Sequence, residues 1–223
     1  MCEICSEIVG DEGLDLIAQM LGGDYRRRVL AESEAMAVLP SIGPLVLGHV
    51  LICPRRHVNR LASLQEEEAE ALAVMKVRVC EVLFETYGHR PQFFEHGASA
   101  DGQNVPCTVS HAHLHAVPVP SIWDDLPQSL RWETVEPTLA SISVQAGNGE
   151  YLYYEDQTGR AVIANSQNVP IESQLLRRVI AKAVGNSAEW NWRLFPNVDH
   201  LQQTYVDLES AFSRADFNLV AVN

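Results

Sequence analysis

The sequence predicts an α+β protein, in which short strands precede and follow one long amphipathic helix. Between residues 63 and 88, apolar residues recur at intervals of three and four, which is the spacing of one helix face. Before this stretch, residues 26–32 and 36–40 are β-rich runs that predict a hairpin. After it, residues 151–164 contain two such runs around a polar turn with a glycine, which predict a second hairpin.

The composition indicates a globular protein that is not built to bind a polyanion. With 47% hydrophobic residues, the 223-residue chain can bury a substantial core. Its 16 Lys and Arg against 29 Asp and Glu give a net charge of −13, which argues against nonspecific nucleic-acid binding but allows a local pocket for a small phosphorylated ligand. No apolar run is long enough to predict a membrane span, and five scattered cysteines do not suggest a disulfide framework. We therefore expect a cytoplasmic protein.

The chain begins with a Cys-x2-Cys pair, Cys2 and Cys5. Two thiolates at this spacing can bind one zinc ion from a tight turn. Two ordinary cysteines in a frayed terminus are the alternative. A short helix over residues 14–21, ended by two glycines, and a strand over residues 48–53 complete the predicted elements before the long helix.

The long helix is predicted to begin at Ser63, which forms a capping box with Glu66, and to end at Gly88. The acidic run 66–68 then lies in the first turn, where it complements the helix dipole and faces solvent. The buried face is expected to contain Leu72, Met75, Val79, Val82 and Leu83.

A strand over residues 92–96 leads into a loop, residues 97–108, that is rich in glycine and small polar residues. Such a loop can bring backbone N–H groups and the amide side chains of Gln103 and Asn104 close to phosphate oxygens. We therefore list both residues as candidates for substrate binding. A plain solvent loop is the alternative.

Three histidines alternate with small or apolar residues at positions 111, 113 and 115. Successive side chains of a strand point to opposite faces, so a strand places His111, His113 and His115 on one face while the residues between them pack into the sheet. A surface strand whose histidines face water is the bland interpretation. Three imidazoles in register favour a functional face, because imidazole can act as nucleophile, acid or ligand near neutral pH.

Residues 121–223 are predicted to form a C-terminal α/β extension that belongs to the same compact unit as residues 1–120. After the hairpin, helices are predicted over residues 173–184 and 198–212. Three residues of the first helix, Gln174, Arg177 and Arg178, could reach a phosphate or carboxylate in the site, but a solvated helix face is the favoured interpretation.

Three motifs together resemble the histidine triad (HIT) family. Residues 111–117 are similar to its His-x-His-x-His motif followed by two apolar residues, and residues 48–57 resemble its strand before the central helix. Residues 2–5 resemble the Cys pair of its zinc-containing branch. The resemblance covers about the first 120 residues and implies an antiparallel sheet with a long central helix. It also implies a homodimer, although the extension could cover the usual dimer surface.

The resemblance implies a structural zinc ion held by Cys2, Cys5, His57 and His111. His49 competes with His57 as the third ligand. A closed site of this kind would tie the N-terminus to the two strands without taking part in the chemistry.

The resemblance also implies covalent catalysis on a small phosphorylated substrate, a nucleotide. His113 would attack phosphorus to give a phosphohistidine, and His115 and Thr108 would stabilise charge on the non-bridging oxygens. The cleaved bond would be a phosphoanhydride, a phosphoramidate or a nucleotide-sugar bond. Retention of a histidine at position 115 favours the hydrolase branches, because the transferase branch typically has glutamine there.

Two residues depart from the family pattern. Ser41 stands where many HIT proteins have an Asp that binds the ribose hydroxyls, and Cys107 replaces the usual Gln before Thr108. A hydroxyl is a weaker partner for a diol than a carboxylate is. These departures leave open a non-catalytic nucleotide-binding protein on a HIT scaffold. A phosphorylase or transferase with a phosphate or sugar-phosphate acceptor also stays open, with the extension supplying the acceptor site.

Overall fold

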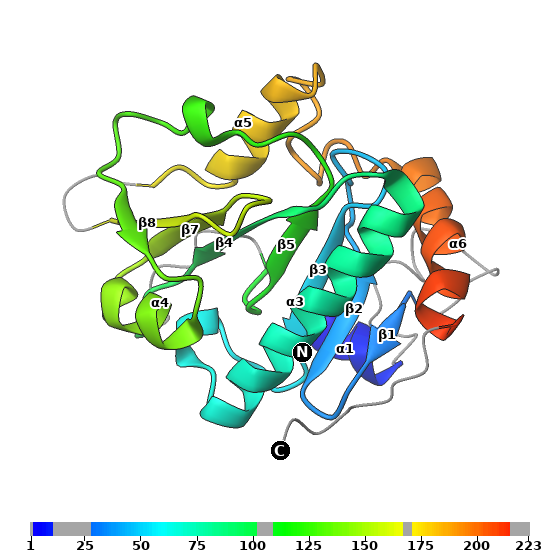
Figure 1. Cartoon of the computed structure of the whole chain (residues 1–223), viewed down its shortest axis with the longest axis horizontal. Helices are drawn as coiled ribbons and strands as arrows, with labels where there is room; N and C mark the ends of the chain where they lie inside the picture. The colour runs from blue at the N-terminus through cyan, green and yellow to red at the C-terminus, as the bar shows by residue number, and fades with distance from the viewer. Residues whose placement is uncertain (1, 11–27, 102–108, 167–170, 215–223) are drawn as a thin grey trace.

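The computed structural model describes residues 2–10, 28–101, 109–166 and 171–214. Its centre is an eight-stranded sheet with the order β1-β2-β3-β5-β4-β7-β8-β6, and every pairing is antiparallel (Figure 1). The strands are β1 (Ala31–Glu32), β2 (Met36–Pro40), β3 (Val50–Pro54), β4 (Gln92–Gly97), β5 (Leu114–Val117), β6 (Glu133–Val135), β7 (Tyr151–Glu155) and β8 (Ala161–Asn165).

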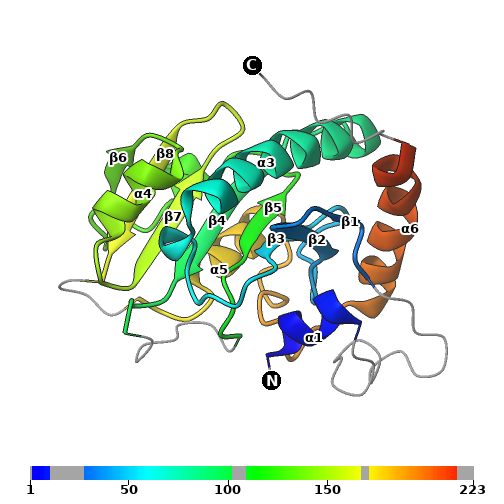
Figure 2. The ribbon, with the colours of Figure 1, turned by 90° about the horizontal axis from the view of Figure 1, so that it is seen from below.

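Helices cover both faces of this sheet (Figure 2). The α-helices of the described residues are α1 (Glu3–Val9), α3 (Glu66–Tyr87), α4 (Leu139–Ala146), α5 (Leu175–Ala183) and α6 (Val198–Arg214). Short 3-10 helices occur at η2 (Leu61–Ser63) and η3 (Trp123–Asp125). Among the described residues, no helix is both long and apolar enough to cross a membrane.

The predicted α+β class is confirmed, as are both hairpins, the long helix and the two C-terminal helices. The predicted strand over residues 26–32 is shorter in the described part of the chain, where it comprises only Ala31–Glu32. The predicted helix over residues 14–21 lies outside the described residues. Two elements of the extension, β6 and α4, were not predicted.

The period-2 alternation of the strands separates two cores. On one face, α3, α4 and α6 pack with the side chains that include Val38, Ile52 and Leu114. On the other face, α1 covers Leu39 and Leu51, while α5 packs in a separate cluster nearer β7 and β8. The space above β3 and β5 on this second face therefore lies between α1 and α5.

The start of the long helix differs from the prediction. The residue before its first turn is Gln65 rather than Ser63, which ends the preceding 3-10 helix. The Gln65 N–H donates to Glu68 Oε2 at 2.8 Å, so the capping box forms two residues later than the sequence suggested. Glu68 is 9% exposed and pairs with Arg56, which corrects the expectation that the whole acidic run faces solvent. The predicted apolar face of this helix is confirmed.

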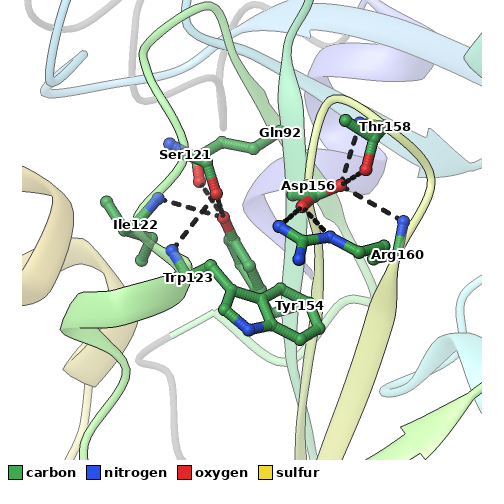
Figure 3. Close-up of polar contacts among 8 residues, drawn as sticks. All are labelled: Gln92, Ser121, Ile122, Trp123, Tyr154, Asp156, Thr158 and Arg160. Atoms are coloured by element: carbon green, nitrogen blue, oxygen red, sulfur yellow. Dashed lines mark hydrogen bonds and ion pairs between the residues drawn. The ribbon is translucent and has the colours of Figure 1, made fainter.

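The extension continues the sheet, because β7 pairs with β4 over five residues. A polar network also ties it to the segment after β5 (Figure 3). The Tyr154 hydroxyl of β7 donates to Gln92 Oε1 at 2.6 Å and accepts the Ile122 N–H at 3.1 Å. Beside it, the guanidinium of Arg160 lies 4.4 Å from the centre of the Trp123 ring. The face opposite α1 has one continuous core, to which both halves of the chain contribute.

Candidate active site and metal centre

The three alternating histidines share one face, as predicted, but only His115 belongs to a strand. His111 and His113 lie before β5, which begins at Leu114. The residues between them still pack in the core under α3, so the alternation persists where the regular pairing has not yet begun. The loss of pairing separates the three rings: His111 turns toward α1, while His113 and His115 stay together at 4.8 Å between ring centres.

The four predicted zinc ligands come together from three segments. Cys2 and Cys5 lie at the start of α1, His57 follows β3, and His111 precedes β5. Their ligand atoms all lie within 4.8 Å of one another. His111 Nδ1 is 3.5 Å from Cys2 Sγ and 3.4 Å from Cys5 Sγ, and His57 Nδ1 is 3.4 Å from Cys5 Sγ. A tetrahedral zinc site has sulfur-to-nitrogen edges of about 3.5 Å, so the donor set fits zinc.

The ring of His111 is held in the tautomer that a metal ligand needs. Its Nε2 lies 2.7 Å from the carbonyl oxygen of Pro54, and a carbonyl only accepts, so Nε2 carries the proton. Nδ1 then presents its lone pair to the two thiols. Burial lowers the pKa of His111 to about 4, against the opposing effect of the Pro54 carbonyl. Burial also raises the pKa of the Cys5 thiol to about 11, and a bound cation would offset this by stabilising the thiolate.

The ring of His113 is oriented by the main chain of His111. Nδ1 of His113 lies 2.7 Å from the His111 carbonyl oxygen, so Nδ1 carries the proton and Nε2 has the lone pair. Burial lowers the pKa of His113, which keeps the ring neutral near pH 7. His113 therefore has one nitrogen committed to the chain and one available as a nucleophile.

A fully buried histidine, His49, fixes the third ring of the triad. The Leu45 N–H donates to His49 Nδ1 at 3.2 Å, so the proton of neutral His49 is on Nε2. That atom lies 2.9 Å from Nδ1 of His115 and donates to it. The proton of neutral His115 is then on Nε2, which becomes a hydrogen-bond donor. Burial lowers the pKa of His49 and of His115 well below the usual value of a histidine, which keeps both rings neutral.

His115 is further held by an aromatic contact. Its ring stacks on Phe94 of β4 with 4.2 Å between centres and 10° between planes. His49 and His57 compete as the third metal ligand in the sequence, and the structure places His57, not His49, in the cluster. His49 and His115 are 66 positions apart in the chain. Their contact could therefore be anticipated only from the alternation of side chains along the paired strands β3 and β5.

His113 and His115 line a cavity on the sheet face that α1 and α5 flank. Leu51 of β3 shares this floor, and the cavity has a volume of about 550 Å³, including the part that is open to solvent. The extension contributes three lining residues: Gln174, Arg177 and Trp192. Arg177 is 4% exposed, so the favoured expectation of a solvated helix face is wrong for this residue. Arg178 follows that expectation in part: it pairs with Glu172 at 2.6 Å away from the cavity, while its guanidinium lies 4.0 Å from the centre of the Trp190 ring.

The opposite wall of the cavity contains two carboxylates and one arginine, Arg28. Glu3 and Glu7 reach it from α1. Glu7 is 1% exposed and forms an ion pair with Arg28, which also donates to the Pro40 carbonyl. The two ends of the cavity thus differ in charge: Glu3 and the Glu7–Arg28 ion pair lie toward α1, and Arg177 lies toward α5.

The remaining predicted substrate residues have mixed outcomes. Ser41 lines the cavity and is 2% exposed, and its hydroxyl donates to the Ile42 carbonyl at 3.2 Å. Gln103, Asn104 and Thr108 lie outside the described residues, so their roles stay predictions.

Comparisons with known proteins agree with the geometry. Residues 23–121 match the family model of the HIT domain. A bis(5'-adenosyl)-triphosphatase from Dictyostelium discoideum is 35% identical over 86 residues, which cover 39% of this chain and 56% of that protein. The bifunctional bis(5'-adenosyl)-triphosphatase/adenylylsulfatase FHIT from Arabidopsis thaliana is 32% identical over 104 residues, which cover 43% and 53%. The chain thus spans about half the length of the relatives it matches.

Solved structures of the same kind are more distant. A Zn-bound histidine triad family protein from Mycobacterium smegmatis is 25% identical, with 51% of this chain and 79% of that chain covered and a TM-score of 0.36. A hypothetical protein from Leishmania major is 21% identical, with 65% and 89% covered and a TM-score of 0.41. The resemblance seen in the motifs is confirmed by the family model, which matches residues 23–121 of this chain to the HIT domain.

Proposed function

We propose that this chain hydrolyses a nucleotide phosphoanhydride, such as that of a dinucleoside polyphosphate, through a covalent intermediate on His113. One observation carries the proposal: the hydrogen bond from His113 Nδ1 to the His111 carbonyl, which leaves a neutral imidazole with its Nε2 lone pair beside the cavity. The printed names of both relatives, which are bis(5'-adenosyl)-triphosphatases, support this substrate class.

The first step forms one bond and breaks one. His113 Nε2 attacks a phosphorus of the substrate, an N–P bond forms, and the anhydride P–O bond breaks with its electron pair on the departing phosphate. The Nδ1 proton stays hydrogen-bonded to the His111 carbonyl, where it supports the positive charge of the phosphorylated ring. The nucleotidyl group is then carried on His113.

The second step returns the enzyme to its initial state. Water attacks the same phosphorus and releases one proton to the solvent, the N–P bond breaks, and its electron pair returns to Nε2 of His113. The products are a nucleoside monophosphate and the nucleotide released in the first step, so one water is consumed for each anhydride bond.

His115 stabilises the charge that develops between these states. Its Nε2–H is the donor left over after His49 has used the other ring nitrogen, and it adjoins His113 in the cavity. Because this donor is already oriented, it does not have to reorganise when negative charge develops on the non-bridging oxygens. Stacking on Phe94 holds the donor in place. We assign Thr108 to the same task on the resemblance alone.

We further propose that Cys2, Cys5, His57 and His111 bind a structural zinc ion. The donor set is that of a closed four-ligand site, which has no open position for a substrate. When bound, zinc would crosslink α1 to the segments that follow β3 and precede β5. The role of these residues is therefore to position the cavity wall and the main chain of His111.

Product analysis tests the proposal. A dinucleoside triphosphate should give a nucleoside monophosphate and a nucleoside diphosphate in equal amounts, at a rate that does not depend on added inorganic phosphate. His113→Ala should remove the activity. Products that incorporate added phosphate would instead assign a phosphorylase, and tight nucleotide binding without turnover would assign a binding protein.

A further inference from the structure

Arg177 brings the C-terminal extension into the candidate active site. It occupies the third position of α5, and its guanidinium is held by two main-chain carbonyls from separate segments. Nε donates to the Trp190 carbonyl at 2.9 Å, and Nη2 donates to the Gly43 carbonyl at 2.5 Å. Because a guanidinium is planar and carries its donors in a fixed fork, two such contacts fix its orientation.

Arg177 lines the same cavity as His113 and His115. Its charge adds to the effect of burial in lowering the pKa of His49 and His115. A buried, oriented cation beside a nucleophile for phosphorus is the arrangement that proteins use to bind phosphate oxygens.

Gln174 adds a second unusual feature to the same wall. It has φ 58° and ψ 26°, a left-handed conformation that residues other than glycine seldom adopt. Its side chain lines the cavity, and its Oε1 is buried without a hydrogen-bond partner among the described residues. Rotation of the amide by half a turn exchanges oxygen and nitrogen, so this group can present an N–H to an anion. Backbone strain of this kind concentrates at functional sites.

The geometry of the reaction determines which part of the substrate contacts the cavity wall that contains Arg177 and Gln174. The attacking and leaving atoms of a phosphoryl transfer lie roughly in line with phosphorus. His113 stands on the sheet floor, so the leaving group departs toward the helices that flank the cavity. Of these, α1 presents Glu3 and the carboxylate of the Glu7–Arg28 ion pair, whereas α5 presents Arg177. An anionic leaving group is therefore favoured on the α5 side.

We propose that Arg177 and Gln174 form a subsite for the phosphate group that leaves with the product, next to the phosphorus that His113 attacks. This inference rests on the proposed function and adds a basis for substrate specificity. The extension favours substrates whose leaving group is an anionic phosphate over substrates whose leaving group is an uncharged amine. Neither residue takes part in forming or breaking a bond.

The test compares two substrates that share the attacked group. One is a dinucleoside triphosphate, and the other is a nucleoside phosphoramidate with an uncharged amine as leaving group. Arg177→Gln should lower kcat/KM for the triphosphate about 10- to 100-fold, the loss expected for a charge-assisted hydrogen bond, and change that for the phosphoramidate less than about threefold. Equal losses on both substrates, or no loss on the triphosphate, would overturn the proposal.

Arg178→Gln is the matched control, because Arg178 is the next residue of α5 but pairs with Glu172 away from the cavity. It should leave both rates unchanged. Because Arg177→Gln removes two contacts to the main chain and can loosen the extension, Gln174→Gly provides a second variant. It removes the amide, relaxes the positive φ and retains the bonds of Arg177, and it should lower only the triphosphate rate.

A binding measurement separates failure of this inference from failure of the proposed function. His113→Ala should be inactive on both substrates; if it is active, the proposed function fails whatever Arg177 does. Calorimetric titration of the His113→Ala protein with inorganic pyrophosphate should show binding, and adding Arg177→Gln should weaken it about 10-fold or more. Unchanged pyrophosphate affinity in the double variant would exclude the subsite.

Discussion

The carbonyl oxygen of His111 accepts the Nδ1–H of His113 at 2.7 Å, while the ring of His111 faces the thiols of Cys2 and Cys5. One residue thus belongs to the proposed metal centre through its side chain and to the cavity through its main chain. Any group that fixes the His111 ring therefore also fixes the tautomer and direction of His113. The proposed metal centre would thus support catalysis without touching the substrate.

Cys5→Ser should abolish zinc binding and destabilise the fold. A hydroxyl is a poor substitute for a thiolate, and α1 would lose its attachment to the segments after β3 and before β5. If zinc is present at about 100 times its Kd, the loss is about 3 kcal/mol, or roughly 6–12 °C in Tm for a chain of this size. Elemental analysis should fall from one zinc per chain to none.

Cys80→Ser is the control for this experiment, because Cys80 lies on α3 outside the cluster. It should retain one zinc per chain. If Cys5→Ser retains the metal as well, the four-ligand centre is wrong.

His49→Ala should lower kcat about 10- to 100-fold, because His115 would lose the donor that fixes its tautomer. His49→Gln should restore part of the rate, since its amide nitrogen lies close to the position of His49 Nε2 and can donate in its place. KM should change less than kcat in both variants, because His49 does not line the cavity. Equal defects in the two variants would indicate that His49 acts only through packing.

Glu95 should make the fold less stable as pH rises from 5 to 7. This carboxyl is 2% exposed, accepts the Leu61 N–H at 2.8 Å and accepts the Tyr151 hydroxyl. Burial raises its pKa from 4.5 to about 7. In this window the unfolded chain loses the proton while the folded chain keeps it, so stability falls with pH, by about 2 kcal/mol.

Urea unfolding of the parent and of Glu95→Gln at pH 5 and pH 7 measures this contribution. The amide cannot ionise, so the free energy of unfolding of the variant should vary less between the two pH values, by about 2 kcal/mol. A parallel pH dependence in both proteins would show that Glu95 ionises as readily in the folded state as in the unfolded chain.

Truncation after residue 120 should give an insoluble protein. It removes β7, which pairs with β4 over five residues, and α6, which contributes Leu208 and Phe212 to the core under α3. An open strand edge beside an exposed apolar face promotes aggregation. We therefore propose that residues 121–223 fold with residues 1–120 as one compact unit. A soluble, cooperatively folded fragment 1–120 would contradict this.

Local patterns predicted most of the framework. The stripe from Leu72 to Leu83 and the alternation around Leu114 depend on the periods of a helix and a strand, and these periods survive in the structure. The helix α4 was missed because it is short and contains Ser141 and Ser143, which have low helix propensity. Its cap, the Thr138 hydroxyl that accepts the Ser141 N–H at 3.3 Å, was the available signal.

The sequence predicted the site residues that belong to the histidine motif. It did not predict the residues that only tertiary packing brings to the site. His113 is two residues from the carbonyl that orients it, whereas His49 contacts His115 across 66 residues and Arg177 contacts Gly43 across 134. No local pattern distinguishes Arg177 from Arg178. The fold separates them, because one step along a helix turns a side chain by about 100° from the cavity toward solvent.

Intact-protein mass spectrometry during turnover tests the central claim most directly. After brief mixing with a dinucleoside triphosphate and acid-free quenching, the parent chain should carry one nucleotidyl group, and His113→Ala should carry none while remaining folded. Peptide mapping should place the adduct on His113. Turnover without an adduct, or an adduct that persists in His113→Ala, would contradict nucleophilic catalysis by this histidine.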